Sequence, residues 1–156
     1  MSMSVPSKVH VHFDGASVSR GGRFVGAWAF TVEGGGIDHE DRGPVEKEPG
    51  SMDPDGSGQE GPTPSTNNVA EYTAAIKALE YLASIGFRGS VDVMGDSQLV
   101  IRQFSGEYSV KSSHLKVLYE RLRALAQNFE KVNFEWVPRE LNRRADYLSK
   151  EALRGH

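Results

Sequence analysis

Residues 90–106, SVDVMGDSQLVIRQFSG, join a short strand directly to a short helix. Residues 90–96 read as the strand, and residues 97–106 read as a helix that ends at Gly106. Asp96 lies at the junction, where its side chain could simply cap the helix. The carboxyl end of a strand is also where open α/β sheets bind their ligands. The junction therefore leaves two roles open for Asp96, a helix cap or a residue of a binding site.

Strands and helices alternate on both sides of this junction. Helical spacing of apolar residues predicts further helices at residues 66–86, 112–129 and 141–154. Strands are predicted at residues 8–13, 24–32 and 131–137, with a weaker one at 37–43. Trp28 and Trp136 are expected in the core. This order of elements predicts an α/β (mixed α+β) fold, with a mixed sheet and helices on its faces.

The length and composition of the chain indicate one globular domain. The chain has 156 residues, of which 38% are hydrophobic and 25% charged. We expect a flexible N-terminus at residues 1–7 and a single domain at residues 8–156. Residues 44–65 hold five of the seven prolines and almost no large apolar side chain, so they predict a flexible loop. The GxGxxG match inside this loop follows no strand and opens no helix, which argues against a dinucleotide site.

Several classes of protein are disfavoured by what the sequence lacks. Cysteine is absent, which excludes disulfides, thiolate zinc sites and cysteine nucleophiles. Oxygen ligands remain, and these suit hard cations such as Mg²⁺ or Mn²⁺. The chain has no run of 18 apolar residues, so no membrane span is predicted. The N-terminal MSMSVPSK has no apolar signal region. We therefore expect a cytoplasmic monomer with no membrane partner.

The charge of the chain is unevenly distributed. Residues 33–60 contain nine acidic and two basic residues, a net of −7, whereas the whole chain carries −3. The rest of the chain is therefore mildly basic, at +4. Such a balance permits a nucleic-acid partner without demonstrating one.

Four acidic residues stand in short, distinctive contexts: Asp14 in VHFDGAS, Glu71 in TNNVAEY, Asp96 in VMGDSQLV and Asp146 in NRRADYL. Asp14 is expected at the end of the first strand, on the face opposite Val9, Val11 and Phe13. Its local alternative is a turn formed by Asp14 and Gly15. Together the four acids predict one carboxylate cluster that holds divalent metal.

Glu71 and Asp146 are expected on different faces of their helices. Glu71 is expected in the first turn of its helix, in line with Ala75, Ala78 and Leu82, so it should face inward. A buried carboxylate needs a cation or hydrogen-bond donors, although a favourable helix dipole is the simpler explanation for an acid there. Asp146 falls off the apolar stripe of the last helix, where a solvated surface acid is the simpler explanation.

The segments VHFDGAS, TNNVAEYTA, GDSQLVIRQFSGE and VPRELNRRAD together resemble the type 1 ribonuclease H family, in its order and roughly its spacing. The resemblance covers about residues 8–153. It implies a ribonuclease H-like fold with a five-stranded mixed sheet and helices on both faces. It also implies an endonuclease that hydrolyses the RNA strand of an RNA–DNA hybrid, leaving 5′-phosphate and 3′-hydroxyl ends. Another nuclease on this fold, or a binding module for hybrid or double-stranded RNA, remains an alternative.

The resemblance also implies roles for individual residues. Asp14, Glu71, Asp96 and Asp146 match the family's metal-binding acids, which would hold two Mg²⁺ (or Mn²⁺) ions with substrate. Two such ions about 3.5–4 Å apart can activate water and stabilise the leaving oxygen. Amide side chains suit base edges and ribose hydroxyls, and the 2′-hydroxyl distinguishes RNA from DNA. The implied substrate contacts are Gly15, Ala16, Ser17, Thr66, Asn67, Asn68 and Gln98.

The sequence departs from the family pattern in three places. The loop before the fourth acid, VPRELNRRAD, has no histidine, and Arg139 is the candidate to help product departure there. Arginine cannot act as a general base, so its role would be electrostatic. The basic helical protrusion of some members is missing, since only GEYSVKSS separates two helices there. The acidic loop at residues 44–65 is longer than usual.

Overall fold

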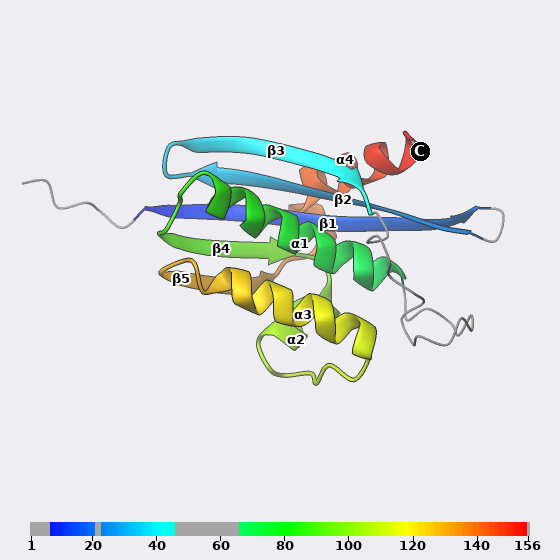
Figure 1. Ribbon diagram of the computed structural model, residues 1–156. Coiled ribbons are helices and arrows are strands. Elements are labelled where there is room, and N and C mark those ends of the chain that lie inside the picture. Colours follow the sequence, from blue (N-terminus) through cyan, green and yellow to red (C-terminus); the bar gives the residue numbers. More distant parts are fainter. Residues whose placement is uncertain (1–6, 21–22, 46–65, 156) are drawn as a thin grey trace, which may run out of the picture.

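The computed structural model describes residues 7–20, 23–45 and 66–155, and its centre is one five-stranded sheet (Figure 1). The strands are β1 (Lys8–Arg20), β2 (Arg23–Gly34), β3 (Ile37–Pro44), β4 (Ser90–Gly95) and β5 (Lys131–Trp136). Their order across the sheet is β3-β2-β1-β4-β5. The three N-terminal strands pair antiparallel, whereas β4 and β5 add to β1 in parallel. The predicted mixed sheet is confirmed.

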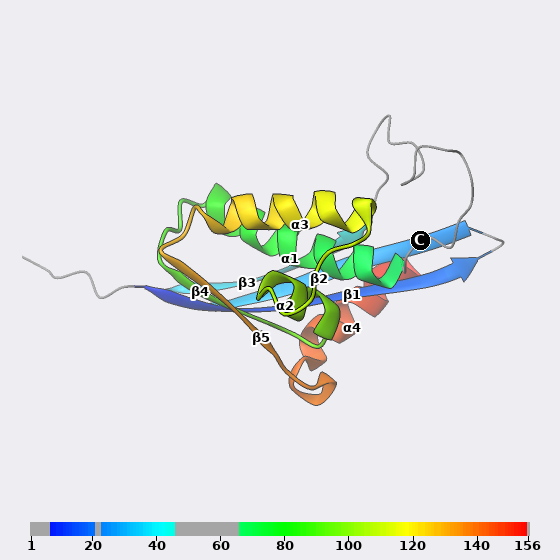
Figure 2. The same cartoon turned by 90° about the horizontal axis from the view of Figure 1, so that it is seen from below.

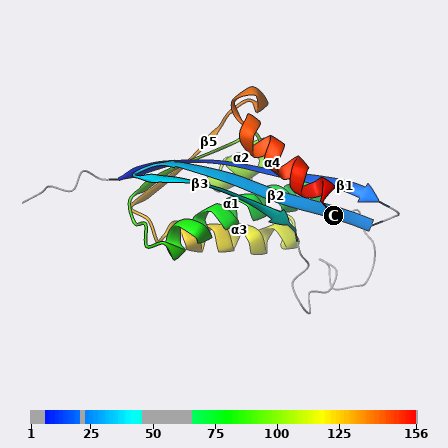
Figure 3. The ribbon, with the colours of Figure 1, turned by 90° about the horizontal axis from the view of Figure 1, so that it is seen from above.

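The helices lie on both faces of this sheet. They are α1 (Thr66–Ser84), α2 (Gln98–Phe104), α3 (Ser113–Ala126) and α4 (Arg143–Arg154), with a 3₁₀ turn at Arg139–Leu141. Figures 2 and 3 show α1 and α3 on one face and α4 on the other. No helix among the described residues has the length and apolar character needed to cross a membrane.

The core lies between the sheet and α1, as the alternation of β1 predicts. Val9, Val11 and Phe13 are fully buried on that face, while His10 is exposed and His12 half-buried on the other. Small residues line α1 where it meets the sheet, and these let the helix approach closely. They include Ala70, Ala74, Ala75 and Ala78, all fully buried. The inward stripe predicted for this helix is confirmed.

The first hairpin is longer than its sequence suggests. β1 continues through the turn-like residues after Asp14 because β2 pairs with it as far as the Arg20–Arg23 pair. Asp14 therefore lies in the middle of a strand, and the prediction that it ends the strand is wrong. The parallel neighbour β4 reaches only to the Phe13–Gly95 pair. Asp14 is thus the first residue of β1 with no partner on that side.

Three further local predictions are corrected. Helix α1 begins at Thr66, so Glu71 lies beyond the first turn, which contains no acid. Ser97, not Asp96, caps α2, because its hydroxyl accepts a hydrogen bond from the Val100 N–H at 3.3 Å. Trp136 is 44% exposed rather than in the core. Residues 1–6 and 46–65, which include most of the predicted flexible segments, lie outside the described residues.

Candidate functional site

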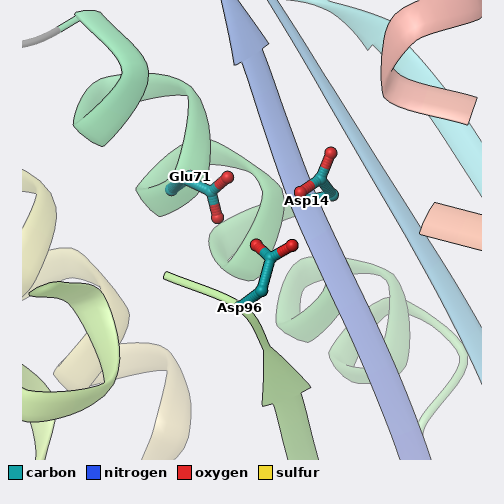
Figure 4. Close-up of side chains that lie close together, drawn as sticks. All are labelled: Asp14, Glu71 and Asp96. Atoms are coloured by element: carbon teal, nitrogen blue, oxygen red, sulfur yellow. The ribbon is translucent and has the colours of Figure 1, made fainter. Parts of the chain in front are cut away.

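Three of the four predicted acids come together at the end of β4. Asp14, Glu71 and Asp96 each offer a carboxylate oxygen, and these oxygens all lie within 4.8 Å of one another. Figure 4 shows the three carboxylates, which come from β1, from α1 and from the residue after β4. Asp14 is 4% and Glu71 8% exposed, so two of the three charges are removed from water.

The fold brings these residues together where β4 ends and β1 continues. Asp96 directly follows β4, and Asp14 follows the last β1 residue that pairs with it. Glu71 reaches the same place because α1 passes directly over Gly15. The Gly15 N–H donates to Glu71 Oε1 at 2.9 Å. This hydrogen bond fixes one oxygen of Glu71 beside β1.

Burial and mutual repulsion make the three carboxyl groups reluctant to ionise. Burial, opposed by the Ser149 hydrogen bond and reinforced by the charges of Asp96 and Asp146, raises the pKa of Asp14 to about 7. Burial, followed by the charge of Asp14, raises the pKa of Glu71 well above its ordinary value. Burial likewise raises the pKa of Asp96, against the lowering effect of Arg139. A bound cation would reverse these shifts.

Two oxygens of the cluster, Glu71 Oε2 and Asp96 Oδ2, are buried and have no hydrogen-bond partner among the described residues. Buried carboxylate oxygens are costly to leave unpaired, so they call for a donor or a cation. The cationic Arg139 Nε lies 3.8 Å from Asp96 Oδ2, which is beyond hydrogen-bond distance. An all-carboxylate set of this kind fits a hard divalent cation such as Mg²⁺ or Mn²⁺.

Asp146 lies beside the cluster rather than within it. Its charge raises the pKa of both Asp14 and Asp96, so it is close to both. Its Oδ2 is held by Lys150 Nζ at 3.1 Å, one turn later on α4. The side chain is 21% exposed, which argues against the local alternative of a fully solvated surface acid. A metal role for Asp146 stays a prediction.

Arg139 stands at the exposed rim of the site. Its side chain is 73% exposed, and its charge lowers the pKa of Asp14 and Asp96. Glu140 follows in the same 3₁₀ turn and is exposed. The position of Arg139 is compatible with the predicted electrostatic role.

The residues predicted to contact substrate flank the carboxylates. Gly15, Ala16 and Ser17 continue β1, Thr66, Asn67 and Asn68 open α1, and Gln98 begins α2. The Ser17 hydroxyl hydrogen-bonds to Asn67 Oδ1, which links β1 to α1. The N–H of Gly15 already donates a hydrogen bond to Glu71. Substrate contact by these residues stays a prediction.

Three contacts around the acids have no signal in the sequence. The buried Ser149 hydroxyl donates to Asp14 Oδ2. The Asn142 side chain donates to the Phe13 carbonyl at 2.9 Å, and the Trp136 indole donates to the Asp96 carbonyl at 3.2 Å. Each joins residues at least 40 positions apart, so only the folded chain could reveal it.

Comparisons with known proteins agree with this fold. A family described as reverse transcriptase-like matches residues 54–152, more than half of the chain. Ribonuclease HI of Halobacterium salinarum is 35% identical over 94% of this chain and 64% of its own length. The Bifunctional protein Rv2228c of Mycobacterium tuberculosis is 43% identical over 89 residues, 57% of this chain. The chain spans only 24% of the length of that relative.

Solved structures match this fold over nearly the whole chain. The crystal structure of RNase H1 from Halobacterium salinarum has a TM-score of 0.76 at 34% identity, covering 96% of this chain and 99% of that one. LC11-RNase H1, solved in complex with an RNA/DNA hybrid, has a TM-score of 0.74 at 29% identity, covering 94% and 97%. The chain therefore belongs to the type 1 ribonuclease H family.

Proposed function

We propose that the protein is a divalent-metal-dependent endoribonuclease that hydrolyses the RNA strand of RNA–DNA hybrids. The products would carry 5′-phosphate and 3′-hydroxyl ends. One observation carries the proposal: three carboxylates share one site, and two of their buried oxygens have no hydrogen-bond partner in the part of the chain that the structure describes. Membership of the family and the hybrid bound by LC11-RNase H1 support the substrate class.

Asp14, Glu71 and Asp96 would hold the metal, with Asp146 as a fourth acid and two ions bound with substrate. When bound, divalent cations provide an activated water at neutral pH and stabilise a departing oxyanion. The protein's own contribution is a rigid arrangement. The Gly15 N–H, the Ser149 hydroxyl and the Trp136 indole each fix one of these acids or its backbone. Held in this way, the acids need little rearrangement on binding.

Substrate selection would come from the residues around the acids. Asn67, Asn68 and Gln98 present amides that both donate and accept hydrogen bonds. Gly15, Ala16 and Ser17 lie on the adjacent strand, and Thr66 opens α1 as the candidate for a phosphate contact. Recognition of the 2′-hydroxyl by this group would distinguish the RNA strand from DNA. Arg139, at the rim, would stabilise negative charge as the product leaves. The cytoplasmic location and monomeric state stay predictions.

The test uses three end-labelled substrates: an RNA–DNA hybrid, a DNA duplex and an RNA duplex of one sequence. Each is incubated with the protein in Mg²⁺ or in EDTA. We expect cleavage of the hybrid's RNA strand alone, only with metal. Asp96→Asn should abolish cleavage while hybrid binding, measured by fluorescence anisotropy, persists.

Each alternative gives a different result in this assay. Cleavage of the DNA duplex at an equal rate would indicate another nuclease on this fold. Binding without cleavage by the wild-type protein would indicate a non-catalytic module. Wild-type turnover by Asp96→Asn would exclude Asp96 as an essential ligand.

A further inference from the structure

Ser149 is a fully buried polar residue in direct contact with the candidate metal site. It lies on α4, one turn after Asp146, and its hydroxyl donates to Asp14 Oδ2. The two residues are 135 positions apart in the chain. A polar group buried so completely requires a hydrogen-bond partner, and Asp14 provides one.

The hydroxyl has a second acceptor within reach, the Asp146 carbonyl at 3.0 Å. A serine in a helix often donates to the carbonyl one turn earlier, so this contact is an ordinary local one. A hydroxyl has only one proton to donate, and an ionised carboxylate is the stronger acceptor. The bond to Asp14 should therefore prevail whenever Asp14 is charged.

Asp14 needs such a partner because its surroundings repel its charge. The negative charges of Asp96 and Asp146 repel it, Arg139 partly offsets them, and β1 leaves it without a strand neighbour on the β4 side. In Figure 4, one oxygen of Asp14 faces Glu71 and Asp96 and the other points away from them. A hydrogen bond that holds one oxygen prevents the carboxylate from rotating, so the other stays available to a cation.

Ser149 also connects α4 to β1. The Asn142 side chain ties the start of the helix to the Phe13 carbonyl, and Ser149 ties its middle to Asp14. Asp146 lies on α4 between these two attachments. The bond of Ser149 therefore fixes Asp14 directly and the helix that carries Asp146 indirectly.

We propose that Ser149 is a positioning residue, which holds Asp14 and the helix of Asp146 in the arrangement that binds divalent metal. The inference rests on the proposed function, since it assigns Ser149 to the same site. It predicts that removing one hydroxyl weakens metal binding without changing how the hybrid docks.

The first measurement is calorimetric titration of Mn²⁺ into the protein without nucleic acid. Removing an outer partner of a metal ligand typically weakens affinity at least 10-fold, so Ser149→Ala should weaken Mn²⁺ binding by about 10-fold. In steady-state cleavage of labelled hybrid at fixed Mg²⁺, kcat should fall by about as much. The KM for the hybrid should stay within about two-fold, because Ser149 is buried and does not reach the substrate.

Two further variants separate the hydroxyl from the fold. Ser149→Thr keeps the hydroxyl and should retain affinity within about three-fold of wild type. Ser84→Ala is the matched control, because Ser84 makes the same kind of local bond, to the Tyr81 carbonyl, far from any site acid. It should leave metal affinity and kcat unchanged. If Ser149→Ala does not fold, Ser149→Cys replaces it, with a much weaker donor in the same place.

The proposal is overturned if folded Ser149→Ala binds Mn²⁺ and turns over like wild type. It is equally overturned if only the melting temperature falls while metal affinity is unchanged, because that result indicates a purely structural serine. If folded Ser149→Thr binds Mn²⁺ as weakly as Ser149→Ala does, the hydroxyl is not responsible for the metal affinity. Failure of the wild-type protein to bind metal or to cut hybrid would instead overturn the proposed function.

Discussion

Two acids of the site, Glu71 and Asp14, each have one carboxylate oxygen that accepts a hydrogen bond from the protein. Glu71 accepts the Gly15 N–H through Oε1, while its Oε2 is buried and has no partner within residues 7–20, 23–45 and 66–155. Asp14 accepts the Ser149 hydroxyl through Oδ2. Such half-satisfied carboxylates are expensive in a protein that has no cation to bind. The pattern is therefore better explained by ligation than by structure.

Arg139 is the residue whose role depends most on charge rather than contact. Because Arg139 Nε is 3.8 Å from Asp96 Oδ2 and the side chain is largely exposed, we expect a moderate effect. Arg139→Ala should lower kcat by about 10-fold and leave some activity, a smaller loss than for a preorganised buried donor. Arg139→Lys should recover part of the rate, since the charge remains. The measurement is steady-state cleavage of hybrid.

Arg143 provides the control for this substitution. It is exposed, opens α4 nearby and, among the described residues, makes no hydrogen bond or ion pair with a site acid. Arg143→Ala should change kcat less than Arg139→Ala does. Equal rates in wild type and Arg139→Ala would remove Arg139 from the site.

Among the elements, the contact between α1 and β1 decides where Glu71 lies. The helix crosses β1 so closely that a Cβ added to Gly15 would lie 2.3 Å from the Ala70 carbonyl carbon and from the Glu71 nitrogen. Both are backbone atoms, so the helix would have to move as a whole. Gly15 is thus required for packing, independently of any contact with substrate.

Gly15→Ala should therefore lower both the stability of the protein and its affinity for metal. We expect a loss of roughly 3 kcal/mol in the free energy of unfolding, at the upper end for overpacked positions. Mn²⁺ affinity should fall as well, because displacement of α1 carries Glu71 with it. Urea denaturation and calorimetric titration measure the two effects.

Gly155→Ala is the matched control for Gly15→Ala. Its added Cβ would meet nothing closer than 3.6 Å, which is ordinary contact, so stability should be unchanged. A Gly15→Ala protein as stable as wild type would contradict the close packing of α1 on β1.

For the whole molecule, the burial of the site's carboxyl groups makes the free energy of unfolding depend on pH. An ionised Asp14 is disfavoured in the folded protein, because burial raises its pKa from 3.8 to about 7. Between these values the folded protein holds a proton that the unfolded chain has lost. Stability without metal therefore falls as pH rises through this window and stays low above it. His12 and His114 act oppositely, since burial lowers their pKa, but their contribution ends near the unfolded value of 6.5.

To isolate the effect of the carboxylates, stability is compared at pH 6.5 and at pH 8 in EDTA. Wild type should lose about 1 kcal/mol of stability over this range. Asp14→Asn should lose less and be more stable than wild type at pH 8. Added Mg²⁺ should raise the melting temperature of wild type more at pH 8 than at pH 6.5. Thermal unfolding followed by circular dichroism provides these values, and a wild-type stability that rises with pH in EDTA would contradict the argument.

Local patterns in the sequence predicted most of the elements and the inward face of α1. Alternation in β1 separated Val9, Val11 and Phe13 from the histidines, and helical spacing placed Glu71 in line with buried alanines. These features depend on neighbours a few residues apart, which any stretch of sequence contains. The length of β1 and the exposure of Trp136 were not predicted, because each depends on distant parts of the chain. The cap of α2 is a local contact between Ser97 and Val100, one residue after the candidate Asp96.

The sequence by itself determined which acids were candidates and, through the family resemblance, what chemistry they suit. Only the tertiary structure decided that Asp14, Glu71 and Asp96 share one site while Asp146 stands beside them. It also decided that Ser149 holds Asp14. The physical reason is that a side chain's local periodicity sets the face it occupies, whereas its partners depend on strand order and helix crossings. Here β4 ends where β1 continues, and the acids meet at that step.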